Sequence, residues 1–223
     1  MQIVPVVDLA GGLVVHAKLG DRDAYRPIET CLSATPDPME VVAGLMRLYP
    51  FPTLYVADLD AIVGRGDNFA ALARIRAAFP DLALWIDSGA SDAALVAATW
   101  EFGTPVLGSE SQRGAALVEA TPDALLSLDF RGEAFQGPAE ILARPEAWPE
   151  RVIVMTLARV GSGAGPDLDR LAAIRALSGS RRLYAAGGVR DGADLAALRA
   201  AGAVGVLVAS ALHDGRIAAS DLQ

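Results

Sequence analysis

Short apolar runs recur along the chain with helical stretches between them, and this alternation constrains the fold more than any other feature. The intervening stretches are rich in Ala, Leu and Arg at helical spacing, as in residues 68–76 and 194–199. Runs that are apolar almost throughout are typical of strands covered on both faces, as in a parallel sheet with helices outside it. The runs span Ile3–Asp8, Thr53–Asp58, Leu82–Asp87, Pro105–Gly108, Ala124–Asp129, Arg151–Thr156, Arg182–Ala186 and Val204–Val208. Eight such strands alternating with helices predict a closed α/β barrel, the (β/α)₈ or TIM barrel.

Length and composition fit this fold and exclude several classes of protein. The chain has 223 residues, close to the roughly 250 typical of this barrel, so we expect one domain over residues 1–223. A hydrophobic content of 52% excludes disorder, and no apolar run approaches the roughly 20 residues of a membrane span. A net charge of −8 without a basic stripe argues against nucleic-acid binding.

The single cysteine, Cys31, rules out a disulfide within the chain, and the N-terminal residues lack the features of a signal peptide. These features predict a soluble cytoplasmic protein with no nucleic-acid or membrane partner. We expect a monomer or a small homo-oligomer.

The two halves of the chain resemble one another, which predicts a duplicated half-barrel. The third and seventh strands end in matching segments, as do the fourth and eighth. Asp8 ends the first strand and Asp129 ends the fifth, and each is followed by a glycine three residues later. Three pairs of positions then correspond: Gly89 with Gly188, Ser109 with Ser210, and Asp8 with Asp129.

The turns after the last two strands predict a phosphate site. Gly187 and Gly188 follow the seventh strand, where backbone N–H groups can approach a ligand with no Cβ in the way. Ala209 and Ser210 follow the eighth strand, and the loops after these two strands commonly build phosphate sites in such barrels. The corresponding residues after the fourth strand, Gly108 and Ser109, are candidates for the other end of the ligand.

Asp8 and Asp129 are the candidate catalytic pair. Each closes an apolar strand, and the first and fifth strands of an eight-stranded barrel lie opposite one another. Two carboxyl groups across one mouth suit a general acid and a general base, provided that one is protonated and the other ionised. Position alone leaves a second interpretation open, in which each aspartate caps its loop by accepting backbone hydrogen bonds.

Other polar positions near the strand ends are weaker candidates. Thr156 ends the sixth strand and could hydrogen-bond a substrate hydroxyl, while Asp58 and Arg190 are candidates for substrate binding. Lys18 could form a Schiff base, which would make the protein a lyase. The two histidines have no metal-ligand spacing, and nothing in the spacing of the acids demands Mg²⁺, so we expect no metal.

Together these residues resemble the histidine-biosynthesis barrel family, which comprises the ribotide isomerase HisA and the cyclase HisF. The resemblance covers nearly the whole chain. It rests on Pro5–Leu9 with Gly11 and Gly12, on Val56–Leu59, on Gly108 with Ser109, on Leu126–Arg131, and on residues 185–192 and 205–212.

The resemblance implies a two-fold repeated barrel that binds a substrate with a phosphate at each end. The isomerase of that family performs an Amadori-type aldose-to-ketose rearrangement without a metal or an organic cofactor. Its two essential aspartates match Asp8 and Asp129, and its sixth-strand threonine matches Thr156.

The chain departs from the isomerase pattern in two places. The isomerase has a Gly-Gly-Gly-Val-Arg-like loop after the third strand. Residues 87–91 stand there in this chain, with an added carboxylate at Asp87 and no arginine, so we expect weaker phosphate binding at this loop. The acid that should follow the sixth-strand threonine is absent, because the segment has Val160 there. Residues 15–27 and 57–62 look more like a HisA-like side branch associated with tetrahydromethanopterin-linked one-carbon metabolism.

We therefore expect an isomerase that acts on a phosphorylated sugar or ribotide by acid–base chemistry and needs no cofactor. Which of Asp8 and Asp129 is the acid stays open. Two alternatives remain: a lyase or synthase on a phosphorylated metabolite outside histidine biosynthesis, and a barrel that binds a phosphorylated ligand without turning it over.

Overall fold

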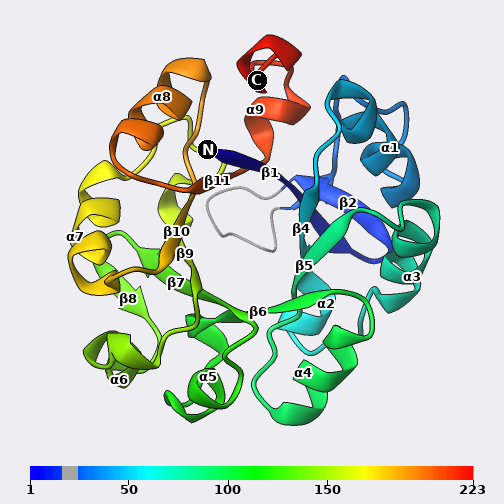
Figure 1. Cartoon of the computed structure of the whole chain (residues 1–223). Helices are drawn as coiled ribbons and strands as arrows, with labels where there is room; N and C mark the ends of the chain where they lie inside the picture. The colour runs from blue at the N-terminus through cyan, green and yellow to red at the C-terminus, as the bar shows by residue number, and fades with distance from the viewer. Residues whose placement is uncertain (17–24, 223) are drawn as a thin grey trace.

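Eight parallel strands close into a barrel in the computed structural model, which describes residues 1–16 and 25–222 (Figure 1). Closure comes from parallel pairing of the last strand with the first, from Gln2 opposite Gly205 to Pro5 opposite Val208. The strands are β1 (Gln2–Ala10), β4 (Thr53–Asp58), β5 (Ala83–Asp87), β6 (Thr104–Gly108), β7 (Leu125–Arg131), β9 (Arg151–Thr156), β10 (Arg182–Ala186) and β11 (Gly205–Val208). All eight predicted strands and the predicted (β/α)₈ barrel are confirmed.

Helices between the strands form the outer ring seen around the barrel in Figure 1. They are α1 (Pro38–Leu48), α2 (Leu59–Ile62), α3 (Phe69–Ala78), α4 (Ala93–Trp100), α5 (Ala116–Ala120), α6 (Ala139–Ala143), α7 (Leu168–Ser178), α8 (Gly192–Ala200) and α9 (Ser210–His213). Aspartates start several of them: Asp92 accepts a hydrogen bond from the Leu95 N–H, and Asp191 accepts from two N–H groups of α8. Such caps satisfy donors that the first helical turn leaves free. Among the described residues, no helix has the length and apolar character needed to cross a membrane.

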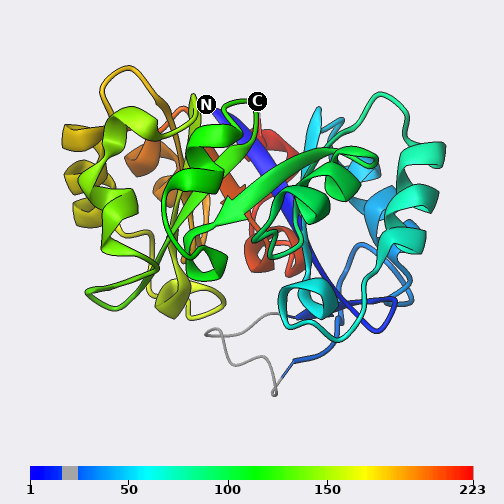
Figure 2. The ribbon, with the colours of Figure 1, turned by 90° about the horizontal axis from the view of Figure 1, so that it is seen from below.

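Short antiparallel strands and 3-10 turns lie in the connections outside the barrel strands. These elements are β2 (Leu13–His16), β3 (Arg26–Pro27), β8 (Ala134–Gln136), and the turns η2 (Ser109–Ser111), η3 (Pro145–Ala147), η4 (Leu157–Arg159) and η5 (Ala219–Leu222). β2 pairs with β1, and β8 pairs with β7. Figure 2 shows the barrel from the side, with β1 running from the N-terminus at the top towards the lower end, where α2 lies.

The period of two along each strand divides the apolar side chains between two cores. One core lies between the strands and the helices, and includes Val7, Leu54 and Leu126. The other fills the barrel, where the Trp85 and Tyr184 rings meet edge to face with their centroids 4.9 Å apart. Large rings inside a narrow barrel require small neighbours, because interiors pack without spare volume.

Gly205 is the neighbour that makes room for Tyr184. A Cβ added at Gly205 would lie 2.4 Å from a ring carbon of Tyr184 and 3.0 Å from the Gln2 carbonyl oxygen. The glycine therefore sets the approach of β11 to both β10 and β1, the two strands with which it pairs.

We predict that Gly205→Ala destabilises the protein by about 1–3 kcal/mol, because an extra methyl must displace a packed ring. Urea unfolding measures the change. Gly114→Ala is the matched control, since the nearest atom to its new Cβ is the mobile carboxylate end of Glu140, at 3.2 Å. Equal stabilities of the two variants would contradict the packing account.

Candidate active site

A cavity opens at the carboxyl ends of the barrel strands, where active sites of this fold lie. Every barrel strand, or the turn that follows it, contributes to the lining. Asp8, Asp87, Glu110 and Asp129 bring carboxylates to it, and the turns after β10 and β11 bring glycine and serine. The cavity therefore combines the two features that the sequence predicts for the site, which are carboxyl groups at strand ends and glycine and serine in the turns after the last two strands.

Asp8 and Asp129 face this one cavity from opposite strands. Three strands separate β1 from β7 on either side of the closed sheet, so the predicted placement across the mouth is confirmed. Asp8 is half-buried and Asp129 is only 5% exposed.

Asp129 is held by three donors around its carboxylate. The Ser127 hydroxyl donates to Oδ1 at 2.6 Å, and the Glu110 backbone N–H donates to Oδ2 at 3.2 Å. The Ser109 hydroxyl lies 3.2 Å from Oδ2 and 2.7 Å from the Gln136 carbonyl oxygen, so it shares its proton between them. This set of contacts fixes the carboxylate but does not remove it from the cavity.

Burial is the main cause that raises the pKa of both carboxyl groups. It raises the pKa of Asp8 to about 7, helped by the negative charge of Asp87. The pKa of Asp129 also rises to about 7, because burial and the charges of Asp87 and Glu110 outweigh the hydrogen bonds from Ser127 and the Glu110 N–H. Near neutral pH, the pair can thus supply a protonated and an ionised carboxyl group at the same time.

Asp87 lies beside this pair and receives a hydrogen bond from Tyr55. The Tyr55 hydroxyl donates to Asp87 Oδ2 at 3.2 Å. Burial, followed by the charges of Asp87, Asp129 and Asp8, raises the pKa of Tyr55 well above its ordinary value, so its hydroxyl stays protonated at neutral pH. A Cβ on Gly108 would lie 3.4 Å from the Oδ2 atoms of both Asp87 and Asp129, so these oxygens are at most twice that distance apart.

The structure brings together the four residues predicted to bind phosphate after the last two strands. Gly187, Gly188, Ala209 and Ser210 all line the cavity. Gly188 has a φ of +87°, and a Cβ there would lie 2.2 Å from the Gly165 carbonyl oxygen, so only glycine fits this turn. His16 reaches the same place, with its Nε2 atom 3.4 Å from the Ser210 hydroxyl oxygen.

The other predicted phosphate residues, Gly108 and Ser109, do not line the cavity. Ser109 is fully buried, and its hydroxyl is engaged by Asp129 and the Gln136 carbonyl.

Asp58 and Arg190 do not line the cavity either. Asp58 is fully buried and accepts hydrogen bonds from the Asn68 N–H and side-chain amide, both at 2.7 Å, and from the Ala61 N–H at 3.2 Å. Arg190 forms a two-pronged pair with Asp194, with both bonds at 2.8 Å. In this structure both side chains stabilise turns through these hydrogen bonds.

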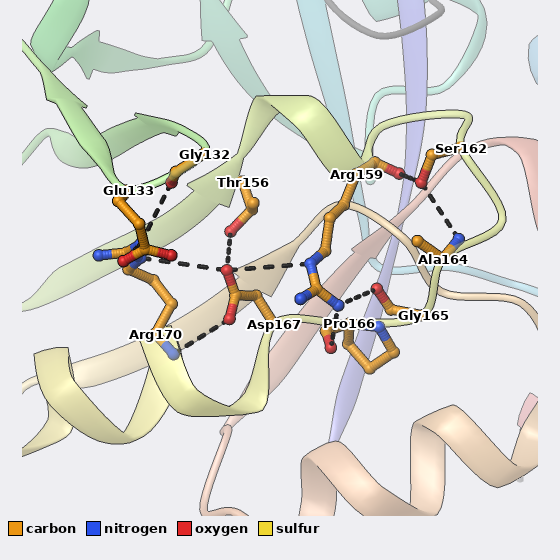
Figure 3. A network of polar contacts seen from close by, with 10 residues as sticks. All are labelled: Gly132, Glu133, Thr156, Arg159, Ser162, Ala164, Gly165, Pro166, Asp167 and Arg170. Atoms are coloured by element: carbon orange, nitrogen blue, oxygen red, sulfur yellow. Dashed lines mark hydrogen bonds and ion pairs between the residues drawn. The ribbon is translucent and has the colours of Figure 1, made fainter.

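Thr156 does not line the cavity and belongs to a polar network with Asp167 and Arg159 (Figure 3). Its hydroxyl donates to Asp167 Oδ2 at 3.3 Å, and Asp167 caps α7 by accepting from the Arg170 N–H at 3.2 Å. The Arg159 Nε atom lies 3.9 Å from Asp167 Oδ2, and its guanidinium donates to the carbonyl oxygens of Gly165 and Pro166. The network joins the end of β9 to the loop that packs on Gly188, and a catalytic role for Thr156 stays a prediction.

Comparisons with known proteins fit this geometry. The sequence profile of the family described as histidine biosynthesis protein matches residues 140–218. An isomerase of Anaeromyxobacter dehalogenans, named for an imidazole-4-carboxamide with two phosphoribosyl groups, is 31% identical over 243 residues, which cover 99% of this chain and 97% of the relative.

The chain belongs to the histidine biosynthesis protein family. Within it, phosphoribosyl isomerase A of Streptomyces griseus is 27% identical over 237 residues, covering 96% of this chain and 92% of that protein. An uncharacterised protein of Methanocaldococcus jannaschii is 26% identical over 216 residues, covering 96% and 94%. The resemblance to HisA-like proteins read from the motifs is therefore confirmed.

Sequence reasoning missed three residues of this family member's site. Ser127 lies two residues before Asp129, and the strand period that puts both on the inner face was the signal for it. Tyr55 lies on the inner face of β4 by the same rule. Arg216 lines the cavity beyond α9 and has no motif that marks it in the sequence. Lys18, the alternative nucleophile, lies outside the described residues.

The raised pKa of Asp8 predicts how stability changes with pH. The folded protein binds more protons than the unfolded chain between pH 4 and 7, so this contribution to stability is present below about pH 4 and is lost as the pH rises through about 7. Asp8→Asn removes the ionisation, so we expect the variant to be about 1–3 kcal/mol more stable than the wild type at pH 8.5, with a smaller gain at pH 5, where only the unfolded wild type is ionised.

Thermal unfolding across this pH range measures the difference between the two proteins. The exposed Asp81→Asn is the control for a lost surface charge. A stability difference for Asp8→Asn that is the same at pH 5 and pH 8.5 would show that ionisation of this carboxyl is not its cause.

Proposed function

We propose that this protein is an isomerase that rearranges a phosphorylated aldose or aldosylamine into the corresponding ketose by acid–base catalysis. One observation carries the proposal: two carboxyl groups, both with a pKa of about 7, face one cavity from opposite strands. Membership of a family whose relatives are named as isomerases supports it. We place the reaction in the cytoplasm and propose that it uses no metal or organic cofactor.

The phosphate of the substrate would bind at the turns after β10 and β11. Gly188, Ala209 and Ser210 offer backbone N–H groups there, and the Ser210 hydroxyl and His16 add further polar atoms. Arg216 lines the same cavity and contributes positive charge. Charged groups and backbone donors at a turn of this kind are the usual means of holding phosphate in these barrels.

The aldose-to-ketose change requires only proton transfers. The ionised member of the pair would remove the proton from C2, while the protonated member gives its proton to the ring oxygen as the ring opens. A proton is then delivered to C1 and the C2 hydroxyl becomes the carbonyl. Substrate and product have the same atoms, and no oxidant or reductant is consumed.

The proposed function predicts the turnover of the Asp8→Asn and Asp129→Asn variants. Incubation in D₂O with ribose 5-phosphate, an N-aryl 5-phosphoribosylamine and the bis-phosphoribosyl imidazole-4-carboxamide, followed by NMR, detects isomerisation and deuterium at the rearranged carbons. We expect conversion of at least one compound by the wild type and a loss of about 10²–10⁴-fold in each variant.

Phosphate affinity of the same variants, measured by calorimetry, separates lost chemistry from lost binding. Wild-type rates in both variants would contradict the roles of the two aspartates. Binding of phosphate compounds with no conversion of any of them would favour a binding barrel, or a reaction of another kind on a metabolite of one-carbon metabolism.

The proposed function also predicts a bell-shaped dependence of kcat/KM on pH with its maximum near 7. The pair needs one carboxyl protonated and one ionised, and both have a pKa of about 7. The other ionisable residues that line the cavity are Tyr25, Tyr55, Asp87, Glu110, Arg131 and Arg216, and Tyr55 stays protonated in this range. A rate that rises steadily to pH 9 would contradict a requirement for a protonated carboxyl.

A further inference from the structure

The two halves of the barrel end in matching turns, but their backbone donors are used differently. Gly89 after β5 corresponds to Gly188 after β10, and Ser109 after β6 corresponds to Ser210 after β11. In the second pair of turns, the N–H groups of Gly188 and Ser210 donate to no other described residue. They remain available to an anion at the cavity wall.

In the first pair of turns, two backbone N–H groups donate to the protein's own carboxylates. The Gly89 N–H donates to Asp87 Oδ1 at 3.0 Å. The Glu110 N–H, next to Ser109, donates to Asp129 Oδ2 at 3.2 Å. Two carboxylates thus accept two of the backbone hydrogen bonds that a phosphate could use at this end.

The residue that creates the difference is Asp87. Its counterpart in the second half is Ala186, and both line the cavity at the ends of matching strands. Replacement of a methyl by a carboxylate occupies the Gly89 N–H and adds negative charge close to Asp129. Like charges brought together in a partly buried site repel one another, because little solvent screens them.

Glu110 and Arg131 also line this half of the cavity. Both are exposed and of opposite charge, whereas Asp129 is buried and Asp87 is half-buried. The more buried charges act most strongly on a ligand, because solvent screens them least. Among the described residues, this end of the cavity is therefore unfavourable for an anion.

We propose that the cavity selects a substrate with a single phosphate, held at the turns after β10 and β11, and that Asp87 excludes a second one. The far end of the substrate would then be uncharged or cationic. This inference rests on the phosphate site of the proposed function. It departs from the substrate with a phosphate at each end that the family resemblance implies.

Calorimetric titration with ribose 5-phosphate and with ribulose 1,5-bisphosphate tests the proposal on the full chain. We expect the wild type to bind the bisphosphate no more tightly than the monophosphate. Asp87→Ala, which copies Ala186, should tighten bisphosphate binding by about tenfold or more and change monophosphate binding by less than about threefold.

Asp87→Asn keeps the side-chain shape and an acceptor for the Gly89 N–H, so it isolates the effect of the charge if the alanine variant fails to fold. Asp81→Ala, which removes an exposed carboxylate far from the lining, should change neither affinity.

The outcomes separate the two proposals. Bisphosphate binding by the wild type that is tenfold tighter than monophosphate binding would overturn the exclusion while leaving the phosphate site intact. An unchanged ratio in both Asp87 variants would also overturn the role of Asp87. Binding of neither compound by well-folded wild type would overturn the phosphate site itself, and the exclusion with it.

Discussion

Parallel pairing of β11 with β1 is the interaction on which the rest of the structure depends. It converts a row of eight strands into a closed barrel, and it puts Asp8 on a strand next to the turn that carries Ser210. Closure also puts β1 and β7 on opposite sides, so that Asp8 and Asp129 face one another across a single opening. Without this pairing, the candidate catalytic pair and the candidate phosphate turns would not share a cavity.

Burial away from water raises the pKa of Asp8 and Asp129 and thereby suits them to acid–base chemistry. A carboxyl group at an exposed strand end would be ionised throughout the neutral range, whereas burial at the mouth of an apolar barrel raises the pKa of Asp8 and Asp129 to about 7. The same burial costs folding free energy when the groups ionise. Active sites commonly contain buried ionisable groups that lower the stability of the fold but are needed for activity.

The two halves of the barrel differ in how the backbone N–H groups of their strand-end turns are used. One half ends in turns whose backbone donors stay open at Gly188 and Ser210, and in the other half the Gly89 and Glu110 N–H groups donate to Asp87 and Asp129. A barrel built from matching halves thus has an end suited to an anion and an end suited to a neutral or cationic group. This polarity would orient a substrate before any chemistry takes place.

The sequence by itself determined the barrel, its eight strands and the strand ends that carry the site, because apolar period and strand spacing are local properties of the chain. It also marked Asp8, Asp129 and the turns at Gly187 and Ser210. Only the tertiary structure decided which polar groups reach the cavity. Thr156, Asp58, Ser109 and Arg190 look like site residues in the sequence, yet each finds a partner from a distant segment or the following helix. Hydrogen-bond partners and loss of water depend on the packed fold, and no local pattern contains them.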